Sequence, residues 1–198
     1  MRFEPRETAS DNPFITTIDA ALWDRAEERD FYIYRGRKGS GSSLFPQNVD
    51  YVRANFEQLR TRGPSYLAET WFERSQLERV ERIACRTLDS ILLAPGQRIQ
   101  YHFLKVDAQG AEYQVLRGGE TFLRGGCVGL HLELFEIPLY QGMTLLPEVV
   151  EYVATLGFEP VRKLPAHSTF NSQYDVIFLK RGVQGAVIDT IRQVYALT

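Results

Sequence analysis

The chain has 198 residues, 44% of them hydrophobic, so it can bury one core, and we expect a single domain over residues 1–198. The formal net charge of −2 provides no surplus of Lys and Arg for a phosphate backbone, so we expect no nucleic-acid partner. No apolar run approaches the roughly 18 residues that a membrane span needs, and we see no basic-then-apolar leader. We therefore expect a cytoplasmic protein without a membrane partner.

Three short strands are predicted near the start of the chain, at Phe3–Pro5, Phe14–Ala20 and Phe31–Tyr34. The last is rich in aromatic residues, which favours a strand at a sheet edge. Two acids, Glu4 and Asp19, stand at the ends of the first two strands, where open α/β sheets bind ligands. Each acid also has a structural interpretation. Glu4 would be solvated near a frayed terminus, and Asp19 would bond to its own backbone in a turn.

The middle of the chain mixes a loop with helical stretches. The run Gly36–Ser43 predicts a flexible surface loop, because it is rich in Gly and Ser and lacks the helix start of a phosphate-binding loop. Arg74, Glu78 and Arg82 are four residues apart, which predicts an ion-paired, solvated helix face. The elements expected here are helices Asp50–Arg62 and Ser65–Arg79, strand Ile83–Arg86 and helix Leu88–Leu93.

The segment from Phe103 to Asp107 predicts a buried strand that ends on an acid. Gly110 then permits a tight turn, and Glu112 lies in the first turn of a helix expected over Ala111–Leu123, where its charge complements the helix dipole. Asp107 is therefore placed at the carboxyl edge of a sheet, where ligands bind. The alternative is that Asp107 only caps the helix that follows.

A second apolar strand is predicted over Cys127–Phe135, parallel and adjacent to the first. His131 and Glu133 have the same parity in it, so both side chains face one way. An acid within so apolar a strand is costly unless it is paired, which makes Glu133 a candidate for function. His131 is either catalytic or a packed, hydrogen-bonded core residue. Asp107, Glu133 and His131 are thus the candidate catalytic residues.

The remaining elements complete an alternating pattern. They are helix Leu145–Leu156, closed by Gly157, strands Glu159–Arg162 and Tyr174–Lys180, and helix Ala186–Leu197. Because strands alternate with helices, the sequence predicts an α/β fold with a doubly wound, mostly parallel sheet. Cys85 and Cys127 lie in apolar strand patterns and have no metal-binding spacing, so we expect buried, reduced thiols.

Taken in order, these segments resemble the FkbM family of S-adenosylmethionine-dependent methyltransferases. The matching pieces are Phe3–Pro5, Asp19–Asp24, Ser42–Leu44, Thr87–Asp89, Lys105–Asp107 with Gly110 and Glu112, Leu116–Gly118, Leu132–Glu133, Pro138–Tyr140 and Gly157–Phe158. The resemblance implies a Rossmann-like sheet, S-adenosyl-L-methionine as cofactor, and O-methylation of a hydroxyl on a sugar, glycan or secondary metabolite. The partner would then be a small-molecule or carbohydrate acceptor. In this reading Glu4 contacts the cofactor's ribose and Asp19 its adenine.

Asp107 is then the best candidate for the reacting centre. Methylation of a hydroxyl requires in-line approach of the oxygen to the methyl group, and a base nearby helps as the proton leaves. The Asp107 carboxylate could orient that hydroxyl, or it could hold a divalent metal that lowers the hydroxyl's pKa. Tyr140 could line the acceptor pocket or simply pack beside Pro138. The residues alone leave these alternatives open, and they predict no set of metal ligands.

One departure from the resemblance concerns the cofactor. Methyltransferases of this class begin with a strand and a Gly-rich turn, and no such segment precedes Phe3. We therefore expect a domain that is incomplete at its N-terminus, with two strand edges lacking a partner and with weak S-adenosylmethionine binding or none. The alternative function is a truncated or degenerate methyltransferase-like domain without catalysis, acting as a binding or interaction module or representing a gene fragment.

Overall fold

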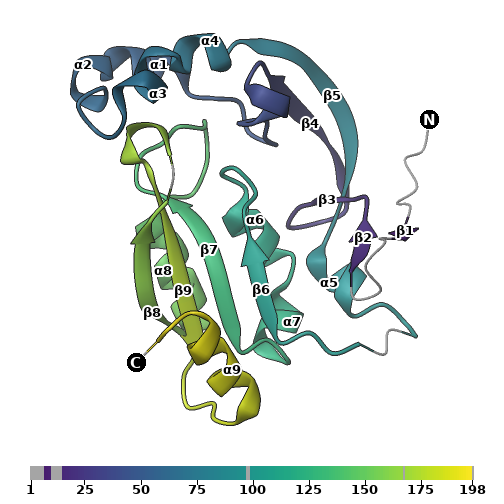
Figure 1. The fold of residues 1–198 in the computed structure, drawn as a ribbon. Coiled ribbons are helices and arrows are strands. Elements are labelled where there is room, and N and C mark those ends of the chain that lie inside the picture. The colour runs from purple at the N-terminus through teal and green to yellow at the C-terminus, as the bar shows by residue number, and fades with distance from the viewer. Residues whose placement is uncertain (1–6, 10–14, 97–98, 167, 198) are drawn as a thin grey trace.

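The computed structural model describes residues 7–9, 15–96, 99–166 and 168–197, so Glu4 and the strand expected at Phe3–Pro5 lie outside the described residues. The strands are β1 Glu7–Ala9, β2 Thr16–Ile18, β3 Ala21–Leu22, β4 Glu27–Tyr34, β5 Leu77–Arg86, β6 Phe103–Val106, β7 Gly129–Phe135, β8 Phe158–Pro165 and β9 Gln173–Lys180. The α-helices are α1 Val49–Ala54, α2 Phe56–Leu59, α3 Ser65–Glu69, α4 Trp71–Arg74, α5 Leu88–Leu92, α6 Glu112–Arg117, α7 Glu120–Arg124, α8 Leu146–Thr155 and α9 Ala186–Val194. Figure 1 shows their arrangement.

The larger sheet has the strand order β6-β7-β9-β8. β6 and β7 are adjacent and parallel, with Phe103 opposite Gly129, which confirms the prediction made for these two strands. β9 runs antiparallel to both β7 and β8. The prediction of a mostly parallel, doubly wound sheet is therefore not confirmed: the fold is α/β, but its four-stranded and three-stranded sheets are mixed, and β1 and β2 form a separate antiparallel pair.

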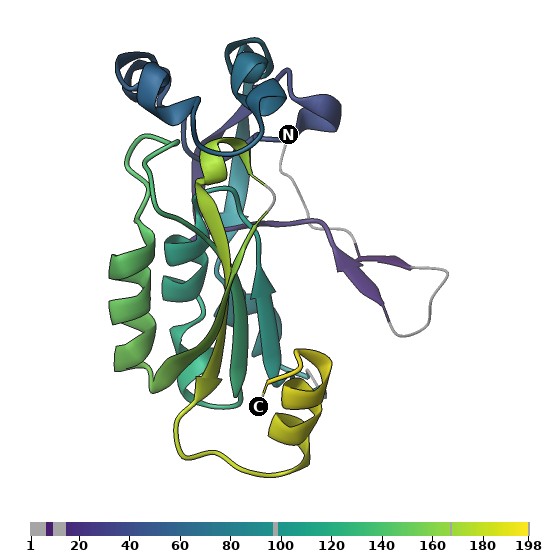
Figure 2. The same cartoon turned by 60° about the vertical axis from the view of Figure 1, so that its left-hand side comes forward.

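The two faces of this sheet are covered unequally (Figure 2). Leu130, Leu132 and Leu134 of β7 are fully buried against one layer of helices, α6, α7 and α8. The helix predicted over Ala111–Leu123 is broken at Gly118 and Gly119 into α6 and α7. On the other face, α9 packs Ile191 close to Gly129 near the start of β7. The polar side chains of β7 lie farther along this second face.

The three-stranded sheet, called the smaller sheet below, has the order β3-β5-β4, with β3 parallel and β4 antiparallel to β5. The prediction that Arg74, Glu78 and Arg82 share a helix face is wrong, because the last two lie on β5. Arg82 lies opposite Asp30 of β4 and forms an ion pair with it at 2.9 Å. Cross-strand pairing of this kind stabilises the sheet where the helical spacing suggested i,i+4 pairs.

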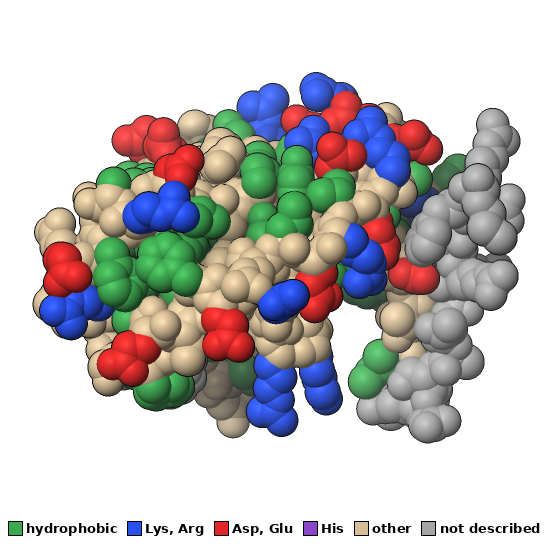
Figure 3. All heavy atoms as spheres, turned by 90° about the horizontal axis from the view of Figure 1, so that it is seen from above, with side chains coloured by type: hydrophobic (Ala, Val, Ile, Leu, Met, Phe, Trp, Pro, Cys, Tyr) green, Lys and Arg blue, Asp and Glu red, His purple; other side chains and the backbone are tan. Residues whose placement is uncertain are grey.

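Helices α1 to α4 lie above the edge of the larger sheet at which β7 ends (Figure 1). They share a second core with residues of both sheets, and Val52, Trp71 and Phe170 are buried in it. Acidic and basic side chains are interspersed over the face seen from above, with hydrophobic side chains between them (Figure 3). None of the helices in the described part of the chain is both long and apolar enough to cross a membrane.

The contacts between the first and the second half of the chain include two near α5 and α6. Gly118, at the end of α6, packs so closely on the backbone of Trp23 that an added Cβ would lie 2.2 Å from the Trp23 oxygen. Asp89 of α5 accepts hydrogen bonds from the backbone N–H groups of Thr121 and Phe122, each at 2.9 Å. Both cysteines are buried and free, as predicted.

Candidate active site

A cavity of about 390 Å³ lies between β3 of the smaller sheet and β6 of the larger one. Each of these strands has a strand partner on only one side among the described residues, so two sheet edges face each other across the cavity. The walls are mainly apolar, and the residues at one end are polar. The lining residues that matter below are Ala20, Ala21, Phe31, Lys105, Asp107 and Gln109. The volume is within the range of about 300–1,000 Å³ usual for small-molecule sites.

Asp107 directly follows β6 and lies at the polar end of this cavity. Its Oδ1 accepts a hydrogen bond of 3.0 Å from the side-chain amide of Gln109, and its Oδ2 lies 3.8 Å from the Lys105 ammonium. The side chain retains 43% of its exposure, so a ligand can reach it. The N-cap of α6 is Ala111, and no side chain caps the helix there. The alternative role for Asp107, a cap of this helix, is therefore not what the structure shows.

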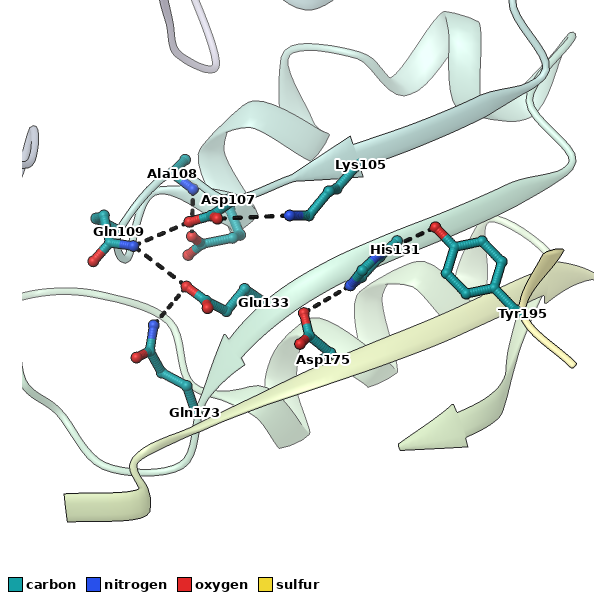
Figure 4. A network of polar contacts seen from close by, with 10 residues as sticks. Lys105, Asp107, Ala108, Gln109, His131, Glu133, Gln173, Asp175 and Tyr195 are labelled. Carbon is teal, nitrogen blue, oxygen red and sulfur yellow. Dashed lines mark hydrogen bonds and ion pairs between the residues drawn. The ribbon is translucent and has the colours of Figure 1, made fainter. Parts of the chain in front are cut away.

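Glu133 of β7 lies beside Asp107 (Figure 4). Its Oε2 accepts hydrogen bonds from Gln109 at 3.3 Å and from Gln173 at 2.6 Å. Burial, followed by the negative charge of Asp107, raises the pKa of Glu133 to about 8. This shift favours the protonated form of the Glu133 carboxyl group at neutral pH.

Glu112 is a third acid near this point, and it has a structural partner for each oxygen. Its side chain turns back to accept the backbone N–H groups of Ala108, at 2.8 Å, and Gly110, at 3.0 Å. Only 3% of the residue is exposed, and this burial raises its pKa to about 7. The first-turn position predicted for Glu112 is confirmed, but its carboxyl group also fixes the turn that carries Gln109.

His131 lies on the same face of β7 as Glu133 and has different partners (Figure 4). One ring nitrogen, Nε2, is 2.7 Å from Asp175 Oδ1, and the other, Nδ1, is 3.1 Å from the hydroxyl of Tyr195. Tyr195 follows α9, so these contacts attach the C-terminal helix to the sheet. The geometry supports the packed, hydrogen-bonded interpretation of His131, and its catalytic role stays a prediction.

The remaining residues named from the sequence are Asp19, Glu4 and Tyr140. Asp19 is exposed, directly before Ala20 and Ala21, which do line the cavity. Glu4 lies outside the described residues. Tyr140 is buried, and its hydroxyl contacts the Gly41 oxygen at 3.1 Å and the Gln109 amide oxygen at 3.2 Å. Burial, then the charge of Glu112, raises the pKa of Tyr140 above its usual range.

Two features of the site were not anticipated. Gln109 and Gln173, which contact the acids, carry no sequence signal beyond their nearness to predicted strands. The segment Gly36–Ser43, expected to be a surface loop, ends inside the structure: Ser43 is 1% exposed, and its hydroxyl donates to the Gln109 main-chain oxygen at 2.7 Å. Within the described part of the chain, no group of three or more His, Cys, Asp or Glu residues could hold a metal ion.

A model of the methyltransferase FkbM domain matches residues 3–160. The chain belongs to the FkbM methyltransferase family. The match covers Asp107, Glu133 and both walls of the cavity, so the candidate site is part of the FkbM domain. Comparison with curated proteins and with solved structures gave no match.

Proposed function

We propose that this FkbM-family chain transfers a methyl group from S-adenosylmethionine to a hydroxyl oxygen of a sugar, glycan or other small metabolite. The observation that carries the proposal is the pair formed by Asp107 and Glu133 at the polar end of the cavity. An acid pair that holds one proton can accept a second proton from a hydroxyl group. The FkbM family match supports methyl transfer as the reaction, and the cavity residues support this part of the structure as its site.

The cavity has features that suit the cofactor. Ala20 and Ala21 leave room for a flat ring beside the aromatic side chain of Phe31. When bound there, S-adenosylmethionine would supply an electrophilic methyl group. Asp19, next to Ala20, could contact the adenine from the mouth of the cavity.

The chain's own residues would then handle the proton. The acceptor hydroxyl must lose its proton on methylation, and the Asp107 carboxylate would accept that proton and pass it to water. Protonated Glu133 would leave the pair with a charge of −1 before this transfer and neutral after it. Positioning of the hydroxyl by these acids supplies much of the expected rate, and proton transfer adds to it.

A non-catalytic binding module is the second candidate, and one observation favours it. Among the described residues that line the cavity there is no glycine, so no Gly-rich turn offers its N–H groups to the amino-acid end of the cofactor. We therefore expect weak binding by the 198-residue chain. We expect a dissociation constant near 100 µM, which corresponds to a binding free energy of about −5.5 kcal/mol.

Calorimetric titration with S-adenosylmethionine tests the cofactor site. We expect weak binding to the chain, and a further loss of about tenfold or more in Ala20→Leu, because the larger side chain fills the cavity. Ala186→Leu is the matched control, since Ala186 is exposed at the start of α9 and should leave the affinity unchanged. Absence of binding at millimolar cofactor would reject the donor site. A micromolar constant would instead show that the expected weakness is wrong.

A further inference from the structure

Gln109 contacts more of the candidate site than either acid does. Its side-chain nitrogen lies 3.0 Å from Asp107 Oδ1 and 3.3 Å from Glu133 Oε2. Its side-chain oxygen is 3.2 Å from the Tyr140 hydroxyl, and its main-chain oxygen accepts from the Ser43 hydroxyl at 2.7 Å. The side-chain nitrogen of Gln109 thus donates to both acids (Figure 4). Its side-chain oxygen and its main-chain oxygen each accept a hydrogen bond from a buried residue.

The backbone at Gln109 is strained, and its surroundings hold it in that conformation. Its φ of 49° lies in the left-handed region, which a residue with a side chain rarely adopts. Glu112 fixes the neighbouring residues by accepting the N–H groups of Ala108 and Gly110. Tyr140 closes the turn from the other side, because an added Cβ on Gly110 would lie 3.1 Å from its ring. This conformation directs the Gln109 amide between the two acids.

We propose that Gln109 is a positioning residue that holds Asp107 and Glu133 side by side as one acid–base pair. Two carboxyl groups at close range repel each other when both are ionised, and a donor shared between them offsets that repulsion. The catalytic meaning of the pair rests on the proposed function. The spatial arrangement of the pair does not rest on the proposed function, because the proton affinity of the two acids can be measured without turnover.

Other charged and titratable groups also surround the pair, so the test must separate their effects from that of the amide. They are Lys105 on β6, Glu112 on α6, His131 on β7, Asp175 on β9 and the Tyr140 hydroxyl. The negative charges of Asp175 and Glu112 add to burial in raising the pKa of Glu133. A substitution at Gln109 leaves all five of these groups in place.

Gln109→Met tests the proposal, since Met has a similar length and no donor. Loss of the donor destabilises the ionised form, so the pair should bind its proton more tightly and titrate about half to one pH unit higher. The readout is infrared spectroscopy of the protonated carboxyl groups over a pH series. If turnover is detected, the apparent pKa in the pH dependence of the rate should rise by the same amount, and the rate itself should fall about tenfold.

Gln114→Met is the matched control, because Gln114 undergoes the same change on α6 and its side-chain oxygen has no hydrogen-bond partner. Its carboxyl titration should equal that of the parent chain. If Gln109→Met does not fold, Gln109→Asn tolerates the left-handed backbone angle, and its shorter side chain withdraws the donor from the acids without adding a charge, so the titration should again move upward. An unchanged titration in the folded Gln109 variant would overturn the proposal. Absence of methyl transfer with the shift present would count against the proposed function alone.

Discussion

Asp107→Asn is expected to lower methyl-transfer turnover about a hundredfold while cofactor affinity changes little. The substitution keeps the shape of the side chain and removes its charge, so the variant can still contact Gln109 but cannot accept the hydroxyl proton. The contact with Lys105, at 3.8 Å between exposed groups, contributes little to stability, and the fold should tolerate its loss. The measurement is the rate of labelled methyl transfer to a panel of hydroxyl acceptors, beside calorimetry of cofactor binding.

Asp89→Asn is the control for this experiment. Both oxygens of Asp89 accept backbone N–H groups at the start of α7, and Asp89 does not line the cavity. Asn keeps one of these two acceptors, so the substitution costs some stability but leaves the candidate site in place. Turnover in Asp89→Asn should therefore stay close to that of the parent chain. Equal turnover in the parent and Asp107→Asn would show that Asp107 has no part in the chemistry.

Gly118→Ala should lower the free energy of unfolding by about 1–3 kcal/mol, the usual range for overpacking. The backbone of Gly118 is helical, with a φ of −72°, so alanine itself fits the local conformation. The cost comes from the contact with the other half of the chain, because the new Cβ would lie 2.2 Å from the Trp23 oxygen and 3.3 Å from the Asp24 Cα. Both are backbone atoms and cannot move aside as a flexible side chain does.

Gly126→Ala provides the comparison for Gly118→Ala. A Cβ at Gly126 would have its closest neighbours at 3.5 Å, an ordinary van der Waals distance. Urea denaturation should therefore find this variant within about 0.5 kcal/mol of the parent chain, as for most mild substitutions. If Gly118→Ala is as stable as Gly126→Ala, the close packing of α6 on Trp23 does not hold the two halves together.

The elements that the sequence predicted best are those with a strong local pattern. β6, β7 and α8 were placed within two residues of their ends, because short apolar runs and a helix closed by Gly157 are local signals. The parallel pairing of β6 and β7 was predicted because the helical segment between them is long enough for a crossover connection. The direction of β9 did not follow, since a buried strand has the same apolar run in either direction.

β5 shows where local patterns fail. Its first half carries alternating charges that also fit a helix face, and only pairing with β4, some fifty positions earlier in the chain, makes it a strand. No single-sequence pattern contains that pairing, because the partner residues, such as Asp30 and Arg82, are far apart in sequence. Tertiary pairing overrides local preference in such segments.

The candidate site was predicted in part for the same reasons. Asp107 and Glu133 could be found because each is an acid near the end of an apolar strand. The position of Asp175 depends on the register that sets it opposite Glu133, and the role of Gln109 depends on an unusual backbone angle. Neither property can be read from residue type or spacing. The sequence therefore predicted the acids but not the groups that hold them.

A crystal structure of the chain with S-adenosylhomocysteine, the product of methyl transfer, tests the central claim most directly. We predict that the adenosine lies between β3 and β6, beside Ala20 and Ala21, with the sulfur facing Asp107. A ligand bound elsewhere, such as the groove between α1 and α4 lined by Arg53 and Phe72, would contradict the proposed active site.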